Sequence, residues 1–133
     1  MQHQGSCLCQ QVSYQVAGDF DSFYLCHCKH CQKDTGSAHG ANLFSQSAKL
    51  QWQRGQDLIK TFKLDGTRHM RSFCSHCGSA LPHLQFEGKL LVVPAGSLDT
   101  AIAIKPNAHL FCRSKANWDE ALEHIIGFDH FPE

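Results

Sequence analysis

Residues 26–36 read CHCKHCQKDTG, which places three cysteines within six positions and two histidines between them. Such a stretch can hold a metal ion, form disulfides, or contain buried thiols that are merely close in sequence. Further pairs occur at Cys7-Leu-Cys9 and Cys74-Ser-His-Cys77, and Cys112 stands alone. The eight cysteines of this 133-residue chain therefore need a common explanation.

The chain carries no signal for export or for a membrane. Its first residues, MQHQGSCLCQ, lack a basic start followed by an apolar run. No stretch reaches the ~18 apolar residues that a membrane helix needs. We therefore expect a cytoplasmic protein, in which thiols stay reduced and metal binding is favoured over disulfides. The formal net charge of zero argues against a nucleic-acid partner, whereas a protein partner remains open.

Length and composition predict one domain over residues 1–133. The period-two alternation of residues 12–16 is typical of a half-buried strand, and further strands are expected at 50–53, 58–64, 70–73, 80–86, 89–93 and 110–113. Pro82 indicates an edge or a bulge. A short helical turn is expected after Cys31, and a helix from Asn117 to Ile126 would make the tail 119–133 partly helical. The predicted class is mainly β.

The number of cysteines limits how their sulfurs can be divided between metal ions. A CxxC pair followed by glycine, as in Cys77-Gly78, is typical of a zinc knuckle, and two pairs give a closed four-thiolate site. Seven clustered cysteines cannot form two full sites, so one ion would have only three sulfurs and keep a fourth position for water or substrate. Spacing alone also permits a zinc ribbon from Cys28, Cys31, Cys74 and Cys77. Iron suits tetrahedral sulfur as well.

The segments GSCLCQQVSYQV, CHCKHCQKDTGS, FCSHCGSAL and NAHLFCRSKANW resemble, in this order, the glutathione-dependent formaldehyde-activating enzyme family, from Gly5 to about Trp118. The resemblance implies a tent-like fold of small β-sheets pinned by two zinc ions. It implies a structural zinc bound by Cys7, Cys9, Cys74 and Cys77, and an open zinc bound by Cys26, Cys28 and Cys31. Gln10 departs from the family's usual glycine, so this knuckle is expected to turn differently or under strain.

The resemblance also implies a carbon–sulfur lyase that condenses glutathione with formaldehyde to S-hydroxymethylglutathione, or acts on a related thiol–aldehyde adduct. An open zinc would hold a thiol as the thiolate nucleophile. His30 and His39 are candidate proton donors, and Lys33 is a candidate ligand for a glutathione carboxylate. Each also fits a solvated surface side chain. His109 matches a family position that lines the cleft or packs, and Cys112 is expected in the core on the last strand.

A second hypothesis is a non-catalytic, zinc-stabilised module that binds a protein partner. In that case Cys26, Cys28 and Cys31 hold a second structural ion, with His27, His30 or a water as its fourth ligand. The two hypotheses differ in whether the second metal position is open to substrate.

Overall fold

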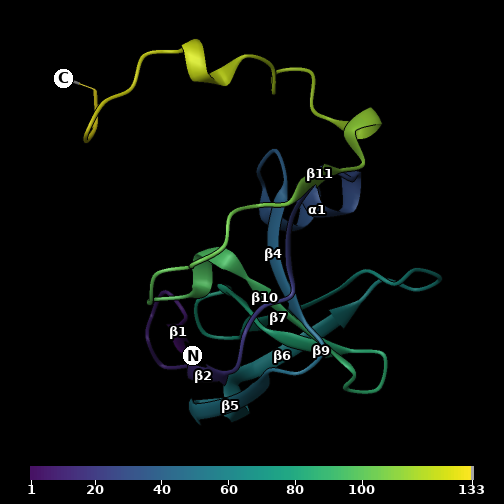
Figure 1. Ribbon diagram of the computed structural model, residues 1–133, viewed down its shortest axis with the longest axis vertical. Coiled ribbons are helices and arrows are strands. Elements are labelled where there is room, and N and C mark those ends of the chain that lie inside the picture. The colour runs from purple at the N-terminus through teal and green to yellow at the C-terminus, as the bar shows by residue number, and fades with distance from the viewer. Residues whose placement is uncertain (133) are drawn as a thin grey trace.

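The computed structural model describes residues 1–132 and shows a mainly β architecture (Figure 1). Within these residues there are three small sheets and one short α-helix, which confirms the predicted fold class. The first sheet has the order β1-β2-β5, formed by Gln2–Ser6, Ser13–Ala17 and Lys49–Arg54. The third has the order β6-β7-β8, formed by Ile59–Lys63, Met70–Cys74 and Ala80–Leu81.

The central sheet has the order β11-β3-β4-β10-β9. Its strands are Ala108–Leu110, Ser22–Cys26, Gly40–Ser45, Leu90–Pro94 and His83–Gln85. The α-helix α1 (Lys29–Thr35) fills the connection between β3 and β4. Short 3-10 helices occupy Gln56–Leu58, Ala95–Ser97, Cys112–Ser114 and Leu122–His124. The pairing of β11 with β3 is parallel, whereas the other strand pairs are antiparallel.

A single cluster of buried side chains forms the core. Tyr14 and Val16 of β2 are buried while their neighbours are half-exposed, as the alternation of residues 12–16 predicts. They join core residues of all three sheets, including Leu43, Leu81 and Val93. The Tyr14 hydroxyl forms a 2.6 Å hydrogen bond with Ser97 Oγ, so the ring is buried without an unpaired polar atom. Cys7 and Cys74 belong to the same cluster, which places two of the predicted metal ligands beside the core.

The strand prediction from the sequence missed three strands and merged two others into one. β1, β3 and β4 were not predicted, because their local composition shows no clear period-two pattern. The expected hairpin strand 80–86 is divided at Pro82: β8 pairs with β7, and β9 pairs with β10. Proline has no N–H to donate to a ladder, so the chain changes sheets at this residue.

The expected last strand 110–113 is wrong in its position. β11 ends at Leu110, because Phe111 adopts a left-handed conformation with φ 56° and a 3-10 turn follows. Cys112 lies in that turn and is exposed, so the expectation of a core residue is also wrong. The parallel pairing of β11 with β3 is nevertheless important, because it brings His109 opposite Leu25 and Leu110 opposite Cys26.

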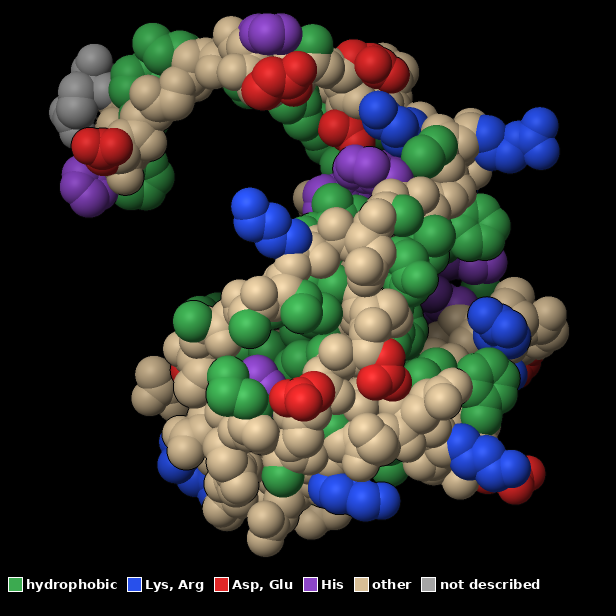
Figure 2. Space-filling view, in the orientation of Figure 1, with side chains coloured by type: hydrophobic (Ala, Val, Ile, Leu, Met, Phe, Trp, Pro, Cys, Tyr) green, Lys and Arg blue, Asp and Glu red, His purple; other side chains and the backbone are tan. Residues whose placement is uncertain are grey.

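The expected helix from Asn117 to Ile126 does not form; the structure has only the 3-10 turn Leu122–His124 there. Figures 1 and 2 show this tail as an arm that extends away from the sheets. Its apolar side chains stay in solvent: Trp118 is 57% exposed and Ile126 76%. A short helix needs an apolar face packed on other elements, and the arm has no such surface. Glu133, the last residue of the range 119–133, lies outside the described residues.

The β5–β6 connection generates a stability prediction. Gly55 has φ 75°, and a Cβ there would meet the carbonyl group of Gln11 and come within 3.0 Å of Val12 Cα. Gly66 has the same φ but nothing within 4 Å. We expect Gly55→Ala to lower the free energy of unfolding by about 3 kcal/mol or more, because backbone strain and a backbone clash add. Gly66→Ala should cost only about 1 kcal/mol. Urea unfolding of both variants measures the difference, and equal losses would contradict the close packing.

Candidate functional site

The first cysteine group joins the first sheet to the third. Cys7 and Cys9 lie between β1 and β2, whereas Cys74 ends β7 and Cys77 follows in the turn to β8. The four sulfurs lie within 4.8 Å of one another. Cys7 Sγ is 3.6 Å from Cys9 Sγ, which is 3.9 Å from Cys74 Sγ. Sulfurs around a tetrahedral zinc with 2.3 Å bonds are about 3.8 Å apart, so this group has the dimensions of a four-thiolate site.

Backbone groups support these sulfurs. The N–H of Val12 donates to Cys7 Sγ at 3.3 Å, and the N–H of His76 donates to Cys74 Sγ at 3.4 Å. Gly78 takes φ 79°, which allows its N–H to fold back onto the Cys74 carbonyl at 2.7 Å. The N–H contacts to sulfur and the glycine turn after the CxxC pair are typical of a zinc knuckle.

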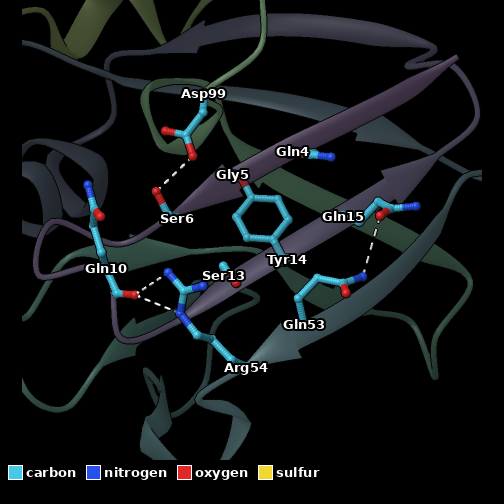
Figure 3. Close-up of a pocket in the computed structure, with 10 residues that line it drawn as sticks. All are labelled: Gln4, Gly5, Ser6, Gln10, Ser13, Tyr14, Gln15, Gln53, Arg54 and Asp99. Carbon is cyan, nitrogen blue, oxygen red and sulfur yellow. Dashed lines mark hydrogen bonds between the residues drawn. The ribbon is translucent and has the colours of Figure 1, made fainter.

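Gln10 accepts the strain that was expected at its position, with φ 66°. Its carbonyl is held by the Arg54 guanidinium through two hydrogen bonds of 2.9 and 2.7 Å (Figure 3). These residues line a polar hollow of about 420 Å³, on whose other side Ser6 donates to Asp99 at 2.7 Å. Because its side chains are bonded to one another, we interpret this hollow as support for the Cys7–Cys9 turn.

The second group consists of Cys26, Cys28 and Cys31, whose sulfurs also lie within 4.8 Å of one another. Cys26 ends β3, Cys28 is the N-cap of α1, and Cys31 lies on α1. The N–H of Cys31 donates to Cys28 Sγ at 3.3 Å. Gln32 donates from Nε2 to the carbonyls of His27 (2.7 Å) and Ser114 (2.9 Å). Its side chain therefore ties the cysteine loop to the segment after β11.

Both groups have the electrostatics of cation sites. All eight cysteines lie in the described part of the chain and none forms a disulfide. Burial opposes ionisation of Cys77, but the N–H groups of Cys9 and Ser79 lower its pKa to about 6. Although the Gln11 N–H acts in the opposite direction, burial and neighbouring thiols raise the pKa of Cys9 to about 12. Thiolates this close repel one another, and a divalent cation among them would remove that conflict.

The same holds for the second group. Burial and then the neighbouring thiols raise the pKa of Cys31 well above its ordinary value. Burial also acts against ionisation of Cys28, but the N–H of Cys31 and the adjacent thiols lower the pKa of Cys28. The negative charge is therefore expected on the N-cap sulfur first. Soft sulfur donors at this separation fit zinc or a similar ion, so each group could hold a metal.

A cleft of about 490 Å³ opens beside the three-cysteine group. All three of its cysteines line the cleft, whereas none of the four cysteines of the other group does. The opposite wall comes from β7 to β10 and the loop before β7, and aromatic side chains such as Tyr24 and Phe44 complete the lining. The second sulfur group is therefore accessible from this cleft, whereas in the first group Cys7 and Cys74 are buried in the core and Cys9 and Cys77 are half-buried.

A charged network crosses this cleft. Asp34 of α1 accepts a 2.9 Å hydrogen bond from His69 Nε2 and pairs with Arg71 Nε at 2.6 Å. The ring of His30 lies against that of His69, with centroids 5.5 Å apart. On the same wall, burial lowers the pKa of His83 to about 4, and its Nε2 is 2.9 Å from Gln85 Nε2. Arg68 lies over the Phe86 ring, 5.5 Å from its centroid.

The histidines and the lysine that the sequence proposed as proton donors or substrate ligands lie at different places relative to the cleft. His30 is exposed and lines the cleft. Lys33 lies on the exposed side of α1 and is not among the described residues that line the cleft, so its role towards glutathione stays a prediction. His39 lies away from the cleft, with its ring 5.2 Å from that of His27. His109 is exposed and is not among the described residues that line the cleft, and its Nδ1 is 2.8 Å from His27 Nε2.

Sequence reasoning missed Asp34, His69, Arg71 and His83. Asp34 is 35 residues from His69, and no local spacing indicates that they meet. The one available signal was Asp34 itself, which lies one helical turn after the cysteines on the predicted helical segment.

The contrast between the two groups predicts unequal effects of losing a ligand. Cys74→Ala should remove one bound zinc and lower the midpoint of thermal unfolding by about 10 °C or more, because that group closes a long loop and structural zinc contributes folding free energy. Cys31→Ala should also remove one zinc but cost less stability, because its partners are local. Cys112→Ala, outside both groups, is the control. Elemental analysis and calorimetry give both readouts, and an unchanged zinc content in either ligand variant contradicts the assignment.

His83 generates a prediction about pH. Its pKa is about 4 in the folded chain and about 6.5 when unfolded, so protonation favours the unfolded chain. With neutral His83, the free energy of unfolding has its full value above pH 6.5. It decreases as the pH falls towards 4, by about 1 kcal/mol at pH 5.5. His83→Gln should lack this part of the pH dependence in urea unfolding. In a histidine NMR titration from pH 7.5 to 5.5, the His83 signal should stay fixed; a shift of that signal within this range would refute the prediction.

Comparisons with known proteins agree with this geometry. No curated protein matches the chain in sequence. A solved structure, described as the crystal structure of a Rhodobacter sphaeroides protein, matches with a TM-score of 0.58 and 17% identity, covering 80% of this chain and 98% of that one; it shows a shared fold. The described residues contain no helix long and apolar enough to cross a membrane. The family model "Glutathione-dependent formaldehyde-activating enzyme" matches residues 2–114, and this chain therefore belongs to that family.

Proposed function

We propose that this chain is a zinc-dependent carbon–sulfur lyase of the cytoplasm that condenses glutathione with formaldehyde to S-hydroxymethylglutathione, or acts on a related thiol–aldehyde adduct. One observation carries the proposal: the three-cysteine group opens into a cleft that also holds a carboxylate, histidines and arginines. Family membership supports the substrate class. Eight free cysteines suit a reducing compartment.

The metal fits the residues present. The donors are three sulfurs, which suit zinc, and among residues 1–132 this group contains three potential ligands rather than four. Zinc bound there would accept the substrate thiol in its fourth position and favour the thiolate form. The cleft would receive the rest of the thiol compound and the aldehyde, and holding both reactants together removes part of the entropic barrier.

The reaction needs proton transfer but no oxidant or reductant. The thiol loses its proton, its sulfur forms a bond to the carbonyl carbon, and the carbonyl π electrons move to oxygen, which then takes up a proton. His30 lies beside the cysteines and can exchange protons with solvent because it is exposed. Asp34 accepts a hydrogen bond from His69 Nε2, which orients the His69 ring. The other ring nitrogen, Nδ1, then carries the lone pair, which makes His69 the second candidate for proton transfer after His30.

Cationic residues of the cleft are suited to a substrate that carries carboxylates. Arg71 is already paired with Asp34, whereas Arg68 makes no ion pair within residues 1–132. A guanidinium binds a carboxylate through two parallel hydrogen bonds. Arg68 is therefore the cleft residue best suited to a glutathione carboxylate, and Lys33 would contribute only from outside the cleft.

A non-catalytic module that binds a protein partner is the second candidate. The observation that favours it is the C-terminal arm, whose Ile126 and Phe131 are 76% and 85% exposed. Exposed apolar side chains along one segment often mark an interaction site. In that case the three-cysteine group would be structural, and its loss would weaken folding without affecting any chemical rate.

The two candidates are separated by a rate measurement. Formation of S-hydroxymethylglutathione from glutathione and formaldehyde can be followed by NMR exchange with and without zinc-loaded protein. We expect at least about a tenfold acceleration by the parent protein and a return to the spontaneous rate with Cys28→Ser. Cys112→Ser, which changes an exposed cysteine outside both groups, should keep the acceleration.

Equal rates with and without protein would refute catalysis for this substrate pair and leave the binding module as the better interpretation. Acceleration that survives in Cys28→Ser would show that the three-cysteine group is not the reactive site.

A further inference from the structure

A third group of potential ligands lies outside both cysteine groups. The ligand atoms of His27, His39 and Asp119 lie within 4.8 Å of one another. His27 follows β3, His39 precedes β4, and Asp119 comes from the C-terminal arm. None of the three is among the described residues that line the substrate cleft. Figure 2 shows histidine side chains gathered where the arm leaves the body of the molecule.

His27 is the unusual member. The residue is 1% exposed, and its Nδ1 has no hydrogen-bond partner among the described residues. An unpaired buried polar atom costs roughly 1–3 kcal/mol, so such atoms are rare and need a reason. The other ring nitrogen, Nε2, is satisfied because it lies 2.8 Å from His109 Nδ1.

The nearest group to the unpaired nitrogen is a carboxylate. Asp119 Oδ2 lies 3.3 Å from His27 Nδ1, but the direction of the contact does not make a hydrogen bond. A proton on Nδ1 would therefore be buried without an acceptor. A proton on Nε2, donated to His109, leaves an outward lone pair on Nδ1 instead. This tautomer is typical of metal-ligating histidines, whose second ring nitrogen donates to a neighbouring acceptor.

We propose that His27 Nδ1, His39 and Asp119 bind a third divalent cation of the zinc class. Two imidazoles and a carboxylate suit zinc, cobalt, nickel or ferrous iron. The 3.3 Å contact also fits, because ligand atoms around a tetrahedral zinc with bonds of 2.0–2.1 Å are about 3.3 Å apart. His109 would then hold the His27 ring in place from behind, and water would complete the coordination.

Such an ion would join two parts of the chain that are otherwise weakly connected. His27 lies between Cys26 and Cys28, whereas Asp119 belongs to the arm that extends into solvent. The bound cation would fix the start of the arm against the loop that carries the three-cysteine group. It is a stabilising site, and it stands independently of the proposed lyase reaction.

The test uses full-length protein whose cysteine groups are already loaded with zinc. Isothermal titration with further Zn²⁺ should show one additional ion per chain, and binding should shift the ¹⁵N signal of His27 Nδ1. Asp119→Asn and His39→Gln should each weaken this step by about tenfold or more. Glu120→Gln is the matched control, because it removes the same charge one residue along from an exposed side chain.

Absence of an additional ion would overturn the proposal, as would an additional ion whose affinity is the same in Asp119→Asn, His39→Gln and the parent protein. Two variants are used because Asp119 and His39 are both partly exposed, so replacing either one should leave the fold intact. The content of cysteine-bound zinc reports folding in each variant and separates misfolding from a change of affinity. The condensation rate is measured separately, so failure of the third site and failure of the proposed reaction are distinguishable.

Discussion

The meeting of Cys7 and Cys9 with Cys74 and Cys77 is the contact on which the rest of the structure depends. It joins the turn after β1 to the turn after β7, across 65 residues between Cys9 and Cys74. Two of these cysteines belong to the hydrophobic core, so the sulfur group and the apolar cluster support each other. A chain of short strands has few long elements to bury, and a metal shared by distant turns would offset the entropy of closing so large a loop.

This arrangement leaves Cys26, Cys28 and Cys31 for a different purpose. They come from one short stretch, so their grouping needs no distant contact, and α1 holds them at the edge of a cleft. The cleft then receives Arg71 of β7 and polar side chains of β9, with Asp34 as the contact between the two walls. A rigid scaffold on one side and an accessible sulfur group on the other are what a reactive metal position requires.

Local patterns were reliable where chemistry is local. The alternation around Tyr14 and the helical segment at Cys31 both appear in the structure. Local patterns failed where packing decides. The apolar residues from Trp118 to Ile126 have helical spacing, but no surface covers them, and Phe111 ends β11 before Cys112 can enter the core. The parallel pairing of β11 with β3, which positions His109 beside His27, could not be read from either strand alone.

The sequence by itself determined the mainly β class and the family, because the cysteine motifs are written in consecutive residues, but the spacing of the cysteines left their grouping open. Only the tertiary structure decided which sulfurs face a cleft, and that Asp34 meets His69 and Arg71 while His27 meets Asp119. The physical reason is that these contacts join strands and loops far apart along the chain. Their geometry follows from sheet pairing and from the burial of apolar side chains, which no local pattern records.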